Sequence, residues 1–96
     1  LVGCSEQGPD SQAATARALV AKKDYRSAVI TLKSAIQKQP NAADLRYLLG
    51  KSLYELGSVS PGLVELNKAR ELGHPEEQIV PMLVRAMVTA GEAQQC

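Results

Sequence analysis

The chain has 96 residues, of which 45% are hydrophobic and 3% aromatic, and eleven basic residues against ten acidic ones give a net charge of +1. This length suits one domain with a modest core, and a charge so balanced does not predict nucleic-acid binding, which usually needs a clear basic excess. No apolar run approaches the roughly 20 residues of a membrane-spanning helix.

The first two predicted helices are separated by the polar stretch KKDY. Asp10 can cap the first helix, whose apolar positions include Ala14, Leu19 and Val20. Asp24 can cap the second, because its carboxylate can accept the free N–H groups of the first turn. The second helix carries one apolar face, formed by Ala28, Leu32, Ala35 and Ile36.

The third predicted helix begins after QPN, where Asn41 and Asp44 resemble a capping box. It ends at Gly57, which can take the left-handed conformation that stops a helix. Ser58 can cap the fourth helix, and Pro61 suits its first turn, where the missing N–H is not needed. Inward positions are Leu45, Leu48, Leu49, Leu53 and Leu56 in the third helix, and Leu63, Leu66, Ala69 and Leu72 in the fourth.

A fifth helix is predicted over PMLVRAMVTA, with Gly91 as its end. Pro81 indicates that the regular helix begins near that residue, since proline fits the first turn. Glu76 and Glu77 precede it, where acidic side chains favour the positive end of a helix dipole. With about five helices, the chain is predicted to be all-α.

The sequence repeats itself at a shift of 34 residues. A period of this length is typical of helix pairs stacked in a solenoid, because one pair cannot bury its apolar face alone. Small residues recur in both helices of the pair, Ala16 with Gly50 and Ala28 with Gly62, which predicts close approach of the paired helices. The apolar positions that coincide are Leu32 with Leu66, Ala35 with Ala69, and Leu49 with Leu83.

These residues resemble the tetratricopeptide repeat (TPR). DYRSAVITLKSAIQKQPN is similar to the second half of that motif, and LRYLLGKSLYELG to the first half. The leading Trp of the motif is absent, and His74–Pro75 moves the terminal proline of the second unit by one residue. Motif positions are filled by Tyr25, Ala28, Leu32, Ala35 and Pro40, and by Leu49, Gly50, Leu53 and Gly57; Gln12, Arg46 and Val80 stand where the Trp would be.

The resemblance implies a right-handed α-solenoid of antiparallel helix pairs. Residues 10–42 would form one TPR unit, residues 43–76 a second, and residues 77–96 the first helix of a third, truncated unit. Leu83, Val84 and Met87 would then lack a covering helix, so the isolated chain is expected to self-associate through that end. The chain is also similar to repeat lipoproteins of the PEP-CTERM/exosortase system, through the segment from DYRSAVI to ELG and through ARELGHPEEQIVPMLVRAM. Those lipoproteins are encoded beside exopolysaccharide genes in Gram-negative bacteria.

Repeat solenoids bind with the concave face lined by the first helix of each unit. Arg17, Lys51 and Arg85 recur there at the repeat period, with Tyr47 and Tyr54 beside Lys51. Cations beside aromatic rings predict a groove for an acidic peptide tail or an anionic polysaccharide. Two alternatives stay open: a solvated face, neutralised in part by Asp44 and Glu55, or a purely structural stacking module with no groove ligand.

No catalytic or metal-binding arrangement is predicted. The single histidine, His74, lies in a turn, and neither cysteine has a histidine near it in sequence. No Cys or His spacing suits zinc, and no Gly-rich phosphate loop is present. We therefore expect a non-catalytic scaffold without a cofactor, and we expect no disulfide between Cys4 and Cys96.

The opening LVGC resembles a bacterial lipobox, in which apolar and small residues precede a cysteine; the resemblance implies a cut between Gly3 and Cys4 and a lipid on the Cys4 thiol. Residues 1–9 would then be a lipobox remnant and polar tether, with the lipid on Cys4. The alternative is an arbitrary start. Ser5 after the cysteine is compatible with outer-membrane sorting by family analogy. The resemblance implies a bacterial cell-envelope protein, lipid-anchored and facing the periplasm.

Overall fold

Five helices follow one another in the computed structural model, which describes residues 9–95. They are α1 (Pro9–Ala21), α2 (Tyr25–Lys38), α3 (Ala43–Glu55), α4 (Val59–Glu71) and α5 (Glu76–Gln95). No strand occurs among these described residues. The all-α prediction is therefore confirmed.

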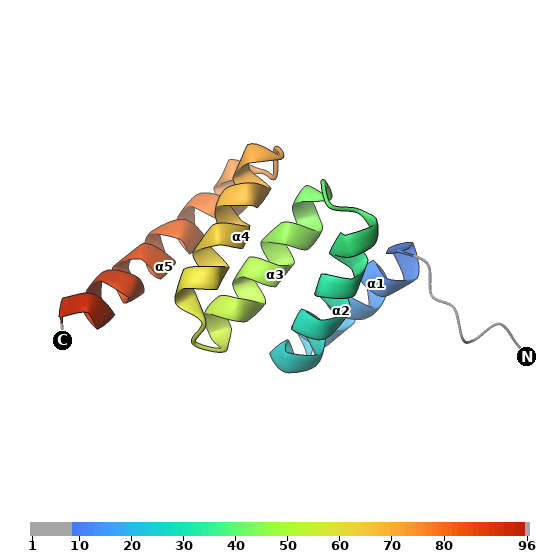
Figure 1. Cartoon of the computed structure of the whole chain (residues 1–96), viewed down its shortest axis with the longest axis horizontal. Helices are drawn as coiled ribbons and strands as arrows, with labels where there is room; N and C mark the ends of the chain where they lie inside the picture. The colour runs from blue at the N-terminus through green and yellow to red at the C-terminus, as the bar shows by residue number, and fades with distance from the viewer. Residues whose placement is uncertain (1–8, 96) are drawn as a thin grey trace, which may run out of the picture.

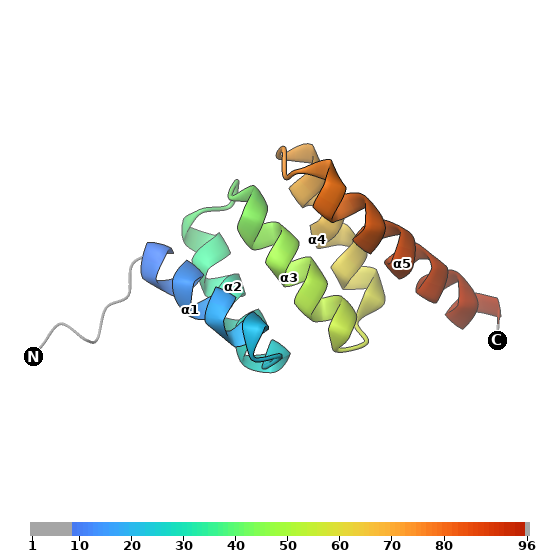
Figure 2. The ribbon, with the colours of Figure 1, turned by 180° about the vertical axis from the view of Figure 1, so that it is seen from behind.

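The helices form antiparallel pairs stacked along one direction, so that α1 and α5 lie at opposite ends of the stack (Figure 1). Each helix packs mainly on the next one in sequence, with sparser contacts from α1 to α3 and from α3 to α5. Figure 2 shows α1, α3 and α5 side by side in one layer, with α2 and α4 behind them. The elongated body, 54 × 25 × 20 Å, is that of an α-solenoid.

Local signals set only some of the helix ends. Ser58 precedes α4 but makes no side-chain cap hydrogen bond, and α1 begins at Pro9, so Asp10 lies inside that helix and not at its cap. The Asp24 carboxylate accepts a hydrogen bond from the Ser27 amide at 3.4 Å, which confirms the predicted cap of α2. Gly57, just after α3, has φ +89°, a conformation that side-chain-bearing residues rarely adopt. The capping box at Asn41 is wrong, because α3 begins after Ala42 with no side-chain cap and the Asp44 carboxylate pairs with Arg17 instead.

Helix α5 departs from the prediction at both ends. It begins at Glu76, not near Pro81, because the Pro75 carbonyl already accepts the amides of Gln78 and Ile79. Pro81 therefore lies inside the helix, at the loss of one backbone hydrogen bond. Gly91 does not end α5, since it is followed by the helix-favouring EAQQ, whereas Gly57 is followed by Ser58 and soon by Pro61.

The core follows the repeat pattern with a few exceptions. Leu56 and Leu72 are exposed, contrary to prediction, because each is the last residue before a glycine turn and points away from the packed face. Ala14 is also exposed, and Leu83, expected to be exposed, is buried in the contact of α5 with α4. One cluster of buried residues joins α1, α2 and α3, through Ala13, Ala16, Val20, Ala28, Leu32, Ala35, Ile36, Leu45 and Leu49. A second joins α4 and α5, through Leu66, Ala69, Ile79, Met82, Leu83 and Ala86.

Candidate functional site

The five predicted site residues lie on α1, α3 and α5, the helices that Figure 2 shows in one layer. We call the surface formed by these residues the first-helix face. Its members are Arg17 on α1, Tyr47, Lys51 and Tyr54 on α3, and Arg85 on α5. Their contacts differ, and the differences divide the face into two halves.

Arg17 is engaged by an acidic side chain. Its guanidinium forms an ion pair with the carboxylate of Asp44, the second residue of α3, and each side chain is about half exposed (54% and 50%). An exposed pair of this kind contributes little to stability, but it offsets the charge of Arg17. The α1 half of the face is therefore locally neutral, as the alternative involving Asp44 foresaw.

Tyr47 is occupied on one side of its ring. Its ring stacks on that of His74, with centroids 4.3 Å apart and planes 14° from parallel. Burial raises the pKa of the Tyr47 hydroxyl above its usual 10.0. His74 is 9% exposed, and its Nε2 lies 2.9 Å from Oε1 of Gln78 on α5. The sequence placed His74 in a turn but gave no signal that the ring folds back onto α3.

Tyr54 joins α3 to α5. Its hydroxyl lies 3.4 Å from the Thr89 hydroxyl, which itself donates to the Arg85 carbonyl at 2.9 Å. Because the Thr89 proton is used in that bond, the Tyr54 hydroxyl is the donor in the pair. Tyr54, which was predicted to line the groove, therefore also helps to fix α5 beside α3.

Lys51 and Arg85 are the two remaining cations of the face. Lys51 is half-buried, Arg85 is exposed, and neither side chain has an ion pair among residues 11–91, whose side chains the structure describes. They occupy matching positions of successive units, 34 residues apart. Glu55, the other acidic residue named for this face, lies four residues after Lys51 at the end of α3 and has no ion pair among residues 11–91. The α3–α5 half therefore carries two cations and one carboxylate, and it keeps a net positive charge.

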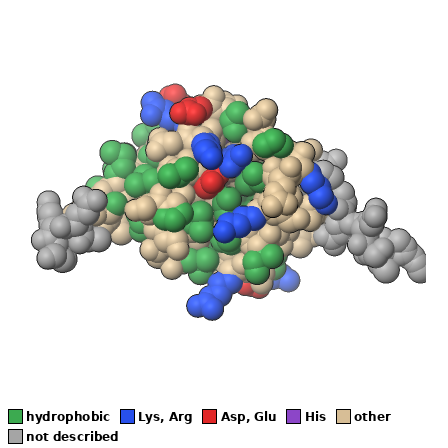
Figure 3. All heavy atoms as spheres, in the orientation of Figure 1, with side chains coloured by type: hydrophobic (Ala, Val, Ile, Leu, Met, Phe, Trp, Pro, Cys, Tyr) green, Lys and Arg blue, Asp and Glu red, His purple; other side chains and the backbone are tan. Residues whose placement is uncertain are grey.

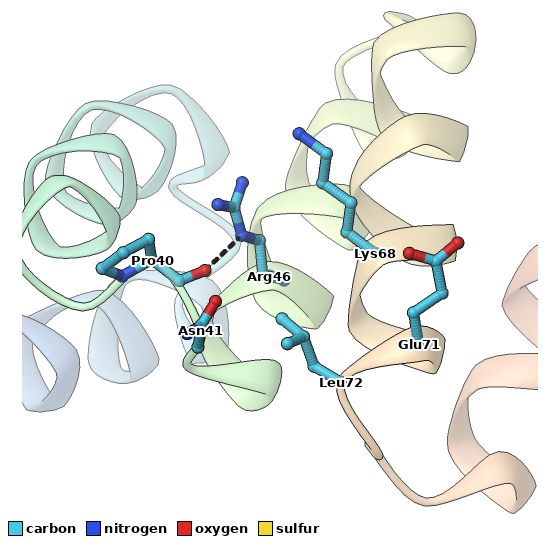
Figure 4. A pocket seen from close by; sticks show the side chains of 6 residues that line it. All are labelled: Pro40, Asn41, Arg46, Lys68, Glu71 and Leu72. Carbon is cyan, nitrogen blue, oxygen red and sulfur yellow. Dashed lines mark hydrogen bonds between the residues drawn. The ribbon is translucent and has the colours of Figure 1, made fainter.

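A hollow of about 260 Å³ lies away from these residues, where α3 begins and α4 ends (Figure 4). Arg46 forms one wall; its Nε donates to the Pro40 carbonyl at 3.1 Å, and its Nη1 to Glu65 at 2.9 Å. The charge of Arg46 is matched by that of Glu65, and Lys68 and Glu71 bring opposite charges to the rim. The other lining residues are Pro40, Asn41 and Leu72. This balance selects no class of ligand.

Sequence reasoning noted Arg46 only as the residue at the Trp position. Its partner Glu65 lies on the second helix of the same unit, so the pair ties α3 to α4. The sequence did hold a signal for this ion pair. Opposite charges occur on the two helices of one unit, at positions where the first unit has neutral residues. The opposite face of the molecule, seen in Figure 3, mixes basic and hydrophobic side chains without separating them into patches.

We also looked for a metal site and a membrane-spanning helix in the described part of the chain. Among the side chains that the structure describes, no cluster of three or more His, Cys, Asp or Glu residues could hold a metal ion. A search of the same residues finds no helix that combines the length and the apolar character needed to cross a membrane. Cys4, the predicted lipidation site, and Cys96 lie outside the described residues.

Stacked antiparallel helix pairs define an all-α solenoid, and its architecture is consistent with a TPR-like fold. The family model described as TPR repeat matches residues 16–57, from within α1 to the turn after α3, and this match supports a TPR protein. TPR repeats generally mediate protein–protein interactions and are generally a non-catalytic fold. No curated protein matches the chain.

Proposed function

We propose that the chain is a non-catalytic protein-interaction module that binds an acidic segment of a partner on the α3–α5 half of the first-helix face. The observation that supports this is the contrast among three matched cations. Arg17 is held by Asp44, whereas Lys51 and Arg85 have no ion pair among residues 11–91. A carboxylate approaching α1 meets the charge of Asp44, and one approaching α3 and α5 meets two cations.

The two cations have different capacities. Arg85 can bind a carboxylate through two parallel N–H donors, which adds geometric specificity. Lys51 acts as a point charge and tolerates a range of positions for the acidic group. Tyr54 on α3 is half-buried and joined to Thr89 on α5, so it offers a rigid flank for the peptide. The ligand class that fits is a short acidic segment, with one carboxylate at each cation.

Titration of a short polyglutamate peptide into the protein, with the heat of binding measured by calorimetry, tests this proposal. Replacing Lys51 and Arg85 together by Ala should weaken binding by at least about tenfold, and binding should weaken as salt rises. A matched variant with Lys22→Ala and Lys33→Ala removes the same charge from exposed positions elsewhere. Equal weakening in both variants would show that only net charge matters and would overturn the site.

An anionic polysaccharide carries similar carboxylates without a peptide backbone. Polygalacturonate is therefore the second titrant, with the same two double variants. Tighter binding of this polymer than of polyglutamate would redirect the proposal from a protein partner to a sugar polymer. Absence of binding to both titrants would favour the purely structural stacking module.

The proposal extends to the cell envelope through Cys4. The sequence LVGC supports cleavage before this cysteine and attachment of a lipid to its thiol, which would place the module at the periplasmic side of a bacterial outer membrane. Mass spectrometry of the protein expressed in bacteria behind a secretory leader tests it, with Cys4→Ser as the control. An unlipidated Cys4 would contradict the anchor, and with it the link to PEP-CTERM and exopolysaccharide systems that the resemblance suggests.

A further inference from the structure

Helix α2 presents a row of exposed side chains whose charges are all positive. We call this row the α2 stripe, and it consists of Arg26, Ile30, Lys33 and Gln37, all of them exposed. Because a helix turns by about 100° per residue, the four positions lie within about 60° of one another around its axis. Ile30 is 72% exposed, the largest fraction among the large hydrophobic side chains that the structure describes.

The cations of the α2 stripe are not neutralised by neighbouring side chains. Arg26 and Lys33 have no ion pair among residues 11–91, and α2 contains no acidic residue. Lys22 and Lys23, in the turn that leads into α2, are also exposed and without an ion pair in that range. The acidic residue of the same turn is Asp24, whose carboxylate caps α2. Four cations against one carboxylate leave this edge of the molecule positively charged.

The second unit does not share this charge. The matching positions 34 residues later on α4 are also exposed, and they hold Ser60, Val64, Asn67 and Glu71. The apolar residue recurs there, as Val64 with an exposed fraction of 52%, but neither cation does. The positive charge is therefore a property of α2, which lies beside α1 at one end of the stack (Figure 1), and not of the repeat.

We propose that the α2 stripe docks the chain on an anionic phospholipid surface. Such a surface offers phosphate groups to the cations and, directly beneath them, a hydrocarbon layer to an apolar side chain such as Ile30. The stripe also has the shape of a ridge, because it projects from a single helix and none of its residues lines the hollow of Figure 4. A ridge meets a planar surface well, whereas a small ligand is usually held in a concave site.

Docking through α2 leaves the first-helix face open. Figure 2 shows α2 behind the layer of α1, α3 and α5, so a membrane lying against α2 does not cover that layer. Cys4 lies five residues before Pro9, where α1 begins, and five residues span at most about 18 Å. A lipid on Cys4, as proposed above, would therefore hold the same end of the stack near the bilayer. The docking itself needs no lipid on Cys4, because its cations and Ile30 all belong to the described residues.

Co-sedimentation of the 96-residue chain with phospholipid vesicles tests the proposal. Vesicles of phosphatidylcholine with about 30 mol% phosphatidylglycerol should bind the chain at about 50 mM salt and release it at about 500 mM, and pure phosphatidylcholine should not bind it. Arg26→Ala with Lys33→Ala should raise the dissociation constant at least about tenfold. Lys68→Ala with Arg70→Ala is the matched control, since it removes the same charge from exposed positions on α4. Absence of binding to the anionic vesicles, or equal weakening by both double variants, would overturn the docking site.

Two further measurements separate lipid from other occupants. Ile30→Ser should weaken vesicle binding about threefold to tenfold, because it removes the apolar group that enters the surface. Val64→Ser, at the matching position of α4, should have no effect, and equal effects of the two changes would overturn docking through α2.

An acidic protein segment is the alternative occupant of the α2 stripe. If Arg26→Ala with Lys33→Ala abolishes polyglutamate binding and leaves vesicle binding unchanged, the lipid surface is overturned. Vesicle binding does not depend on whether polyglutamate binds at Lys51 and Arg85, so the two proposals fail separately.

Discussion

The two helix pairs, α1 with α2 and α3 with α4, share one repeat register but cross at different distances. In the first pair the crossing residues are Ala16 and Ala28, both fully buried, so each helix accommodates a Cβ. In the second pair they are Gly50 and Gly62, and an added Cβ on either would lie 3.0 Å from the backbone oxygen of the other. The size of the crossing residue therefore decides how closely the pair packs.

The pairs also differ in the polar contact that joins their helices. In the first pair, Gln12 Nε2 donates to the Ser34 hydroxyl at 2.9 Å, and Gln12 Oε1 is buried without a hydrogen-bond partner. In the second, Arg46 at the matching position forms an ion pair with Glu65, and their side chains are only 15% and 16% exposed. The same location thus carries a neutral contact in one pair and a charged one in the other.

The largest expected effect comes from breaking the charged contact. Arg46→Ala should reduce the free energy of unfolding by about 3 kcal/mol, because it leaves the Glu65 carboxylate buried without its partner. Gln12→Ala should cost about 1 kcal/mol, the value of a neutral hydrogen bond. Urea denaturation followed by circular dichroism measures both.

A double substitution separates the pair from the packing around it. Arg46→Met with Glu65→Leu removes both charges and keeps most of the volume, so it should lie within about 1 kcal/mol of the wild type. If Arg46→Ala lowers the free energy of unfolding no more than Gln12→Ala does, the Arg46–Glu65 ion pair is exposed to water in solution. The contrast between the two helix pairs would then be only geometric.

The second prediction concerns the glycine crossing. Gly50→Ala should destabilise by about 1–2 kcal/mol, because overpacking against Leu66 outweighs the gain in helix propensity. Gly91→Ala is the matched control, since nothing lies within 4 Å of its added Cβ, and it should be neutral or stabilising by up to about 1 kcal/mol. Equal effects of the two changes would mean that α3 and α4 separate without cost.

The repeat pattern explains why much of the fold could be predicted. Apolar residues spaced along one face of a helix, such as Leu32 and Leu66, specify the buried side whatever lies against them. Asp24 and Gly57 acted locally, so their roles could be inferred from a few neighbours. Short-range signals were not sufficient everywhere, because the capping box at Asn41 and the stop at Gly91 also rest on a few neighbours and the structure contradicts both.

The site was less predictable because its side chains are positioned by contacts distant in sequence. Arg17 was paired across 27 residues by Asp44, and Tyr47 was covered by a ring from the loop after α4. The register showed which residues share a face, but it carried no information on the rotamers that join neighbouring helices. Pro81 misled for a related reason, since the start of α5 depends on the carbonyl of Pro75.

A smaller effect is expected at Ser52. Its hydroxyl is fully buried with no hydrogen-bond partner, whereas the matching residue of α5 is Ala86, also fully buried. Ser52→Ala should stabilise the chain by about 0.5–1 kcal/mol, since it removes an unsatisfied polar group and improves helix propensity. Ala86→Ser should destabilise by about 1 kcal/mol or more, and a stabilising result for Ala86→Ser would sink this explanation.

The smallest expected effect is on the pH dependence of stability, and it arises from the stacked rings of Tyr47 and His74. The matching positions of the first repeat hold Ala13 and Pro40, which cannot stack in this way. Burial raises the pKa of Tyr47 above 10.0 in the folded chain. The phenol of the unfolded chain therefore ionises first, so this contribution to stability is intact below about pH 10 and is lost as the pH rises through the folded-state pKa. Tyr47→Phe should remove that loss, and Tyr25→Phe, which leaves the stack in place, should retain it. Urea midpoints at about pH 8 and about pH 11 measure the difference. If the Tyr47→Phe chain loses as much stability between these two pH values as the wild type, the Tyr47 hydroxyl is open to water. The stack would then not distinguish the second helix pair from the first.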